Sequence, residues 1–114
     1  MNGYPIPRLL TETPTLQNSF TTAFSSPITL ISHSNIVFIS GLITRSSQPS
    51  GGLIICNCSS VFRPVRTHYI WCQDGSGGVN GRVDIGSDGN LLFILGTLAN
   101  TSQTLVISGS YSLI

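Results

Sequence analysis

Apolar and polar positions alternate with a period of two over several stretches of this chain. Over 81–85, charged residues alternate with Val83 and Ile85, so an extended backbone would have one apolar and one polar face. Turn-forming residues fill 87–90, and 91–95 is apolar throughout. The pattern predicts a β-hairpin with a glycine that accepts positive φ at the turn, and a second strand covered on both faces.

Similar short apolar runs, separated by Gly, Ser, Asn and Asp, recur along the chain, and no window repeats at helical spacing over three turns. Many short strands at such spacing indicate an all-β fold, here an antiparallel β-sandwich of short strands. The predicted strands are Phe20–Phe24, Ile28–Ser32, Ile36–Thr44, Leu53–Asn57, Arg66–Cys72, Gly81–Ile85, Leu91–Leu95, Thr104–Ser108 and Ser110–Leu113.

The first residues differ in character from the rest. Pro5, Pro7 and Pro14 fall in a stretch with little periodicity, which favours an extended backbone outside the core. We therefore divide the chain into an extended leader, 1–15, and a β-sandwich head domain, 16–114.

One predicted strand is apolar on both faces. In Ile36–Ile43, Ile36 and Phe38 lie on one face while Val37 and Ile39 lie on the other. A sandwich strand normally hides one face only, so a neighbouring subunit is the simplest second cover. These four residues are our candidates for a subunit interface; a covering loop of the same chain is the alternative.

Composition supports an assembly. Charged residues make up 8% of the 114 residues, the net charge is +1 and all five basic residues are arginines. So little charge argues against nucleic-acid binding and is unusual for a small monomer, so we favour an oligomer over an unusual monomer. No apolar run approaches the length of a membrane span, and we expect no secretory signal, because the first residues lack a basic segment followed by an apolar one.

Catalytic and metal-binding patterns are sparse. The chain has four acidic residues and two histidines, and Asp84 and Asp88 flank the predicted hairpin turn, where we expect both to face solvent. Cys56, Cys58 and Cys72 lack zinc-site spacing and do not form a disulfide framework, so we expect buried free thiols. We expect no enzyme activity, no metal and no cofactor.

An aromatic group stands on one predicted strand, at His68, Tyr69 and Trp71. Tyr and Trp are enriched at binding hot spots, but they are also common sheet residues. We favour the second interpretation.

The order of several motifs resembles a known class. Phe62-Arg63-Pro64 precedes the hairpin, and the motifs are Leu16–Phe20, Asn35–Ile43, Phe62–Pro64, Gly81–Asn90 and Ile107–Tyr111. This order over about 16–114 resembles viral fibre heads (knobs), most like the compact atadenovirus-type adenovirus head, with a phage tail-fibre tip as the close alternative.

The resemblance implies a homotrimer of antiparallel β-sandwiches at the virion surface that binds a host cell-surface receptor, protein or glycan. Binding would use loops on a rigid scaffold, and the two longest polar loops supply the receptor-binding candidates Arg45, Gln48, Asp74, Ser76 and Asn80. Arg63 precedes a proline and is expected to bond a neighbouring strand, within or between subunits. The alternative function is a structural module that trimerises a fibrous shaft without binding a receptor.

Overall fold

The computed structural model describes residues 9–75 and 80–114 of the chain. In these residues it forms strands and one short 3-10 helix, η1. The elements are β1 (Leu10–Glu12), β2 (Thr21–Thr22), β3 (Thr29–His33), β4 (Ile36–Thr44), β5 (Leu53–Asn57), η1 (Ser60–Phe62), β6 (His68–Asp74), β7 (Gly81–Ile85), β8 (Asn90–Leu95) and β9 (Leu105–Ser112).

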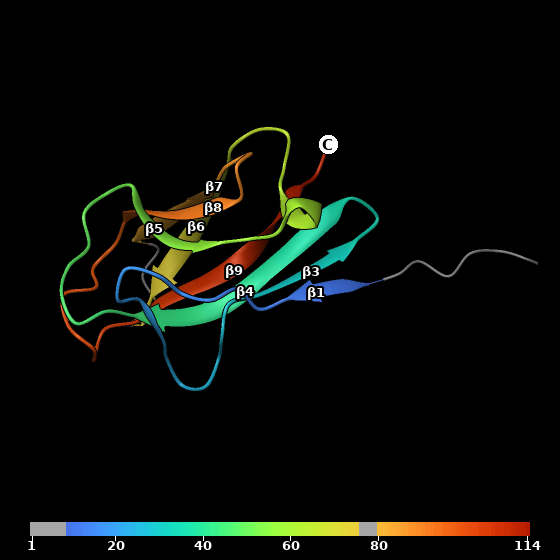
Figure 1. The fold of residues 1–114 in the computed structure, drawn as a ribbon. Coiled ribbons are helices and arrows are strands. Elements are labelled where there is room, and N and C mark those ends of the chain that lie inside the picture. Colours follow the sequence, from blue (N-terminus) through green and yellow to red (C-terminus); the bar gives the residue numbers. More distant parts are fainter. Residues whose placement is uncertain (1–8, 76–79) are drawn as a thin grey trace, which may run out of the picture.

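The strands form one continuous antiparallel sheet in the order β1-β3-β4-β9-β6-β7-β8-β5, with β2 paired to β4. The sheet curls into a half-barrel, so that β5, β7 and β8 face β3, β4 and β9 across the core (Figure 1). Strand β6 joins the two halves: Gln73 and Asp74 pair with β9, whereas 68–72 pairs with β7. The all-β antiparallel class is confirmed, but the expected sandwich is a single curled sheet.

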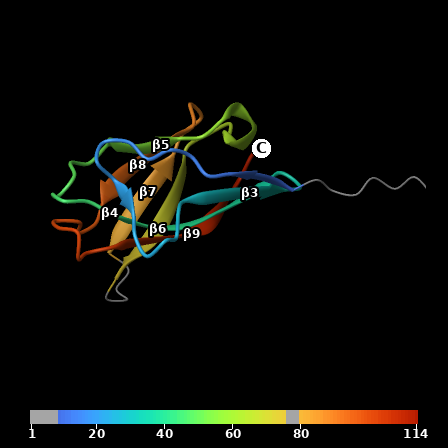
Figure 2. The same cartoon turned by 60° about the horizontal axis from the view of Figure 1, so that its bottom comes forward.

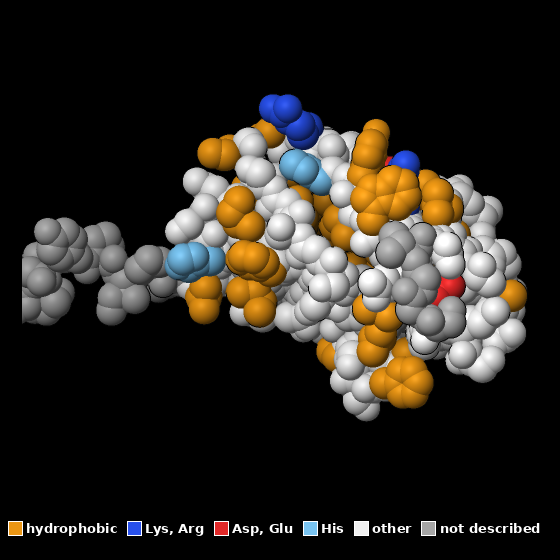
Figure 3. Space-filling model, turned by 180° about the vertical axis from the view of Figure 1, so that it is seen from behind, with side chains coloured by type: hydrophobic (Ala, Val, Ile, Leu, Met, Phe, Trp, Pro, Cys, Tyr) orange, Lys and Arg blue, Asp and Glu red, His pale blue; other side chains and the backbone are white. Residues whose placement is uncertain are grey.

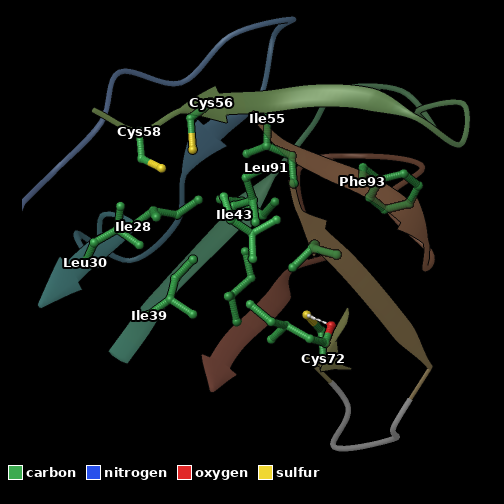
Figure 4. Packing of buried hydrophobic residues seen from close by; sticks show 14 of the residues in the cluster. Ile28, Leu30, Ile39, Ile43, Ile55, Cys56, Cys58, Cys72, Leu91 and Phe93 are labelled. Atoms are coloured by element: carbon green, nitrogen blue, oxygen red, sulfur yellow. Dashed lines mark hydrogen bonds between the residues drawn. The ribbon is translucent and has the colours of Figure 1, made fainter. Parts of the chain in front are cut away.

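The core lies on the concave side of this sheet. Alternate residues of the strands point inward and are almost completely buried, including Val37, Ile43, Ile55, Val83 and Leu105. Figure 4 shows side chains from both halves of the sheet meeting in this space. Period-two alternation thus separates an apolar inner face from a mixed outer face.

Local irregularities increase the buried area at β5. The pairing of β5 with β8 shifts register between Ile54 and Cys56, and this bulge lets consecutive residues Ile55 and Cys56 both lie in the core. Nearby, the Tyr111 hydroxyl donates a hydrogen bond of 2.7 Å to the carbonyl of Phe62, which satisfies a buried polar group.

The sequence located most strands but not all their limits. The two predicted strands 104–108 and 110–113 form one strand, β9, because Gly109 continues the ladder opposite Ile39. Residues 10–12, placed in the leader, form edge strand β1 paired with β3. The division of the chain at residue 15 stays a prediction. In the described residues, no helix is long and apolar enough to span a membrane.

The two ends of the molecule differ. The loops β4–β5 (45–52) and β8–β9 (96–104) lie together at one end, whereas β1 and the C-terminus lie toward the other (Figures 1 and 2). The rigid sheet therefore presents a cluster of loops at the end away from β1.

Candidate functional site

A cavity opens at the loop-bearing end of the sheet. Its volume is about 480 Å³, within the range of small-ligand sites. We call it the loop-end cavity; it is formed by the loops β2–β3 and β8–β9 and by the end of β6 with Gly75. Its lining residues are Phe24, Asp74, Gly75, Thr97, Ser102, Gln103 and Thr104.

Side-chain hydrogen bonds fix the β8–β9 loop that forms one wall. The amide of Gln48 donates to the carbonyl of Gly96 at 2.7 Å and accepts from the backbone N–H of Leu98 at 2.9 Å, which holds Thr97 between them. The hydroxyl of Thr44 donates to the carbonyl of Gln103 at 2.7 Å. Polar side chains from the neighbouring loop and strand thus order this wall.

Phe24 stands at the rim of the cavity in an unusual conformation. Its side chain is 82% exposed, and its φ of 53° and that of Ser25, 55°, lie in the left-handed region. A bulky residue at positive φ is a genuine outlier. Strain that the surrounding structure maintains is most often found at binding sites, so the exposed aromatic ring is a functional candidate.

Asp74 ends β6 and brings a carboxylate to the cavity. Its Oδ2 accepts a hydrogen bond of 3.0 Å from the side-chain amide of Asn80, and the N–H of Gly75 bonds the carbonyl of Thr104 at 3.0 Å. A side chain at Gly75 would meet the Thr104 hydroxyl at 2.5 Å. Gly75 is therefore packed tightly against the β8–β9 loop where both line the cavity.

The structure divides the five loop residues predicted from the sequence. Asp74 lines the cavity, and the side-chain amide of Asn80 donates a hydrogen bond to its carboxylate. Gln48 does not line the cavity but orders the β8–β9 loop that forms one wall. Arg45 is half-buried and donates to the carbonyls of Asn18 and Ser47 at 2.9 and 2.8 Å, so it organises its own loop. Ser76 lies outside the described residues.

Sequence reasoning did not find Phe24 or residues 102–104 as parts of one site. They occur in loops that are distant in sequence, and only the curl of the sheet brings them together. The lining combines one carboxylate, an amide, hydroxyls and an aromatic ring. Such groups bind a polar ligand by hydrogen bonding and stacking, and Asp74 is the only acidic group among the lining residues, which leaves no carboxylate pair for acid–base catalysis.

A second surface lies on the outer face of β6 and β7, and we call it the outer aromatic platform. Tyr69 and Trp71 are 62% and 59% exposed. Arg82 lies 4.3 Å from the ring centre of Tyr69 and forms an ion pair of 2.9 Å with Asp84. The expectation that Asp84 faces solvent was wrong: it is 8% exposed, because Arg82 two residues earlier on the same face covers and neutralises it.

A third surface, the β3–β4 apolar face, concerns assembly. Val37 and Ile39 are buried in the core of the single chain, whereas Ile36 and Phe38 are exposed beside Ile31 on the outer face, where apolar side chains gather (Figure 3). The chain itself therefore covers one of the two apolar faces of β4, the face that carries Val37 and Ile39. Of the four interface candidates on β4, only Ile36 and Phe38 are exposed enough to contact another subunit.

Arg63, another interface candidate, forms its bonds within the chain. Its Nε donates to the carbonyl of Cys58 at 3.0 Å and its Nη2 to the side chain of Asn57 at 3.2 Å. Gly89 of the β7–β8 turn packs directly against this guanidinium. Arg63 thus connects η1, the end of β5 and the hairpin turn.

The three cysteines are free and buried, as expected. Burial raises the pKa of Cys56 to about 12 and the pKa values of Cys58 and Cys72 to about 11. A thiol is a good nucleophile only as the thiolate, so these side chains act as core residues. In the described residues no cluster of His, Cys, Asp or Glu has metal-binding geometry.

Comparison with known proteins adds a structural likeness. No family model matches the chain, and no curated protein matches it. The structure resembles the receptor binding protein (gp15) of Listeria phage PSA, with a TM-score of 0.69 and 16% sequence identity over 92% of this chain. The match spans 65% of that protein, and at this identity it shows the fold alone.

The matched protein comes from a phage, and its name describes receptor binding. This chain thus has a fold that is also found in a phage receptor-binding protein.

Proposed function

We propose that this chain is the receptor-binding tip of a phage tail fibre and attaches the virion to a bacterial surface through the loop-end cavity. The fold is that of a phage receptor binding protein. The cavity lies at the end of the sheet away from β1, where it can meet a cell surface. Its lining suits a receptor with hydrogen-bonding groups.

The observation that carries this proposal is Phe24. An aromatic side chain that is 82% exposed on a strained backbone, beside a polar cavity, has no role in the core. Exposed aromatic residues are enriched among those that dominate binding energy. The wall opposite is fixed by Gln48 and Thr44, so the site is ordered before a ligand arrives.

Binding of the full chain to intact cells tests the proposal. The chain, labelled at its amino terminus, is incubated with a panel of Gram-positive strains that begins with Listeria, the host named for the matched phage. We expect saturable binding to at least one strain. Phe24→Asn removes the ring but keeps a residue that tolerates positive φ, and it should weaken binding about tenfold.

Ser25→Asn is the matched control, because Ser25 has the same backbone conformation but does not line the cavity. It should bind like the unchanged protein. Absence of binding to every strain overturns host attachment. Equal binding of Phe24→Asn and Ser25→Asn overturns the assignment to the cavity.

We further propose that the tip is a homotrimer that uses the β3–β4 apolar face. Ile31, Ile36 and Phe38 are 37%, 37% and 53% exposed in the isolated chain, and adjacent exposed apolar side chains mark interaction surfaces. If the chain trimerises but binds no cell, the alternative function, a structural module that registers a fibre, replaces attachment.

A further inference from the structure

The outer aromatic platform has no part in the loop-end cavity. Tyr69 and Trp71 occupy successive outward positions on β6, about 7 Å apart along a strand, and they pair with Asp84 and Arg82 of β7. More than half of each aromatic side chain is exposed. Packing in the core therefore does not account for the presence of either ring at these positions.

Arg82 holds the rings in place. Its guanidinium lies 4.3 Å from the ring centre of Tyr69 and 5.8 Å from that of Trp71, which are cation–π distances. It also bonds Asp84 through Nε and Nη2, at 2.9 and 3.1 Å. This fork fixes the guanidinium and balances its charge. Because the guanidinium already holds the two rings in place, little conformational entropy is lost when a ligand binds them.

The platform has a polar rim. Gln73, the next outward residue of β6, is exposed and pairs with Val106 of β9. Continuing this register brings the exposed, outward-facing Ser108 and Ser110 alongside the aromatic residues, and a side chain at Gly109 would contact Ile70. Hydroxyl and amide groups thus border the two rings.

We propose that this platform binds a neutral saccharide. A sugar ring offers an apolar C–H face, which packs on an aromatic ring, and a rim of hydroxyls, which the Gln73, Ser108 and Ser110 side chains can bond. An anionic ligand would require an unbalanced positive charge, but Arg82 is neutralised by Asp84. An apolar protein surface, including a second copy of this chain, would leave the rim groups without partners.

This site goes beyond the proposed attachment function, because it is a different surface and its ligand can be tested without a host. The two surfaces share only β6. Asp74 reaches the cavity at the end of that strand, whereas Tyr69 and Trp71 face outward from its middle.

Trp71 is the only tryptophan in the chain, so tryptophan fluorescence, excited at a wavelength that tyrosine does not absorb, reports on this site alone. We would titrate the full protein with glucose, galactose, N-acetylglucosamine, N-acetylgalactosamine and rhamnose, each to 50 mM. At least one should change the fluorescence saturably, with a dissociation constant of roughly millimolar order. Because the site is neutral, raising the salt concentration should leave binding within about twofold.

Tyr69→Ala keeps the reporter and removes one ring, and it should weaken binding about tenfold or more. Val65→Ala, which truncates another exposed apolar side chain (65% exposed) outside the platform and the cavity, is the matched control and should leave sugar binding unchanged. The proposal fails if no sugar gives a saturable response, or if Tyr69→Ala responds like the unchanged protein. It also fails if dilution alone exposes Trp71 to acrylamide quenching, which would show that another copy covers the platform.

Discussion

Within residues 9–75 and 80–114, three pairs of consecutive residues have left-handed backbone conformations without any glycine. They are Asn18-Ser19, Phe24-Ser25 and Ser34-Asn35. Asn tolerates this region because its short polar side chain bonds locally, and the last pair forms the two-residue β3–β4 turn, where both residues require positive φ. Phe24 is the exception, because its side chain has no such compensation.

A stability measurement tests whether Phe24 is a strained residue kept for binding or a residue that supports the fold. Phe24→Asn should raise the free energy of unfolding by about 1 kcal/mol, because Asn is far less strained than Phe at positive φ. Urea denaturation checks this. The same variant is expected to lose cell binding, so a gain in stability with a loss of binding identifies Phe24 as functional. A less stable variant would show that Phe24 supports the fold.

The buried thiols predict a loss of stability at alkaline pH. The pKa values of Cys56, Cys58 and Cys72 are raised from 9.0 to between about 11 and about 12 by burial, so the folded chain retains protons that the unfolded chain releases. This contribution is complete below pH 9 and is lost as pH rises toward about 12. Melting temperatures measured from pH 8 to 11 should therefore fall.

Thiol labelling gives an independent check. Iodoacetamide at pH 8 should modify none of the three cysteines in the folded protein within the time that modifies all three in urea, since thiolate and access are both lacking. Rapid labelling of the folded chain would contradict the burial of these residues.

At the scale of the elements, the sequence located the hairpin of β7 and β8, its turn and the positive φ at Gly89, 86°, from local alternation and turn residues. The expectation that the second strand is covered on both faces was wrong: β8, which begins at Asn90 rather than Leu91, buries Leu91 and Phe93, whereas its other face is only half-buried and Leu95 is 41% exposed. What the sequence did not show is the reason for glycine: a Cβ at Gly89 would lie 2.6 Å from the carbonyl oxygen of Cys58 and 2.5 Å from Arg63 Nε. That contact is made by residues distant in sequence.

Gly89→Ala should therefore be more damaging than the same change at another glycine of similar φ. Gly52 has φ +90° with nothing within 4 Å of an added Cβ, so Gly52→Ala should cost only the backbone strain, about 1 kcal/mol. Gly89→Ala should cost about 1–3 kcal/mol more, because overpacking displaces Arg63 from its hydrogen bond. Equal losses in urea denaturation would contradict this packing.

Other elements show where local patterns are insufficient. Strand β1 has only three residues and follows a proline-rich stretch, and its pairing depends on β3 rather than on its own alternation. The outward Tyr69 and Trp71 were seen in the sequence but were assigned to ordinary sheet packing. Their exposure is decided by which side of β6 faces the core, which requires the whole sheet.

At the scale of the whole molecule, the curl of the sheet accounts for most of what the sequence left open. Alternation indicates that a strand has two faces, but not whether the strands form two layers or one bent sheet. The loop-end cavity exists only because the β2–β3 and β8–β9 loops and the end of β6 converge at one end. The apolar residues of β4 illustrate the same limit, since one face is covered by the chain itself.

Solution mass tests the proposed trimer. Light scattering should give three times the chain mass of 12.1 kDa for the unchanged protein. Phe38→Asp places a charge in the β3–β4 apolar face and should shift the mass toward that of one chain. Val65→Asp, at a residue 65% exposed outside that face, is the control and should remain trimeric. A monomeric unchanged protein would rule the assembly out.

Strand β6 has a consequence for engineering. Its residues point alternately to the aromatic platform and to the core, and its last residue reaches the cavity. A shift of one residue in its pairing would turn Ile70 and Cys72 outward and the aromatic rings inward. Chimeras that exchange specificity between tips should therefore place their junctions in the loops before and after this strand, and should transplant it only as an intact unit.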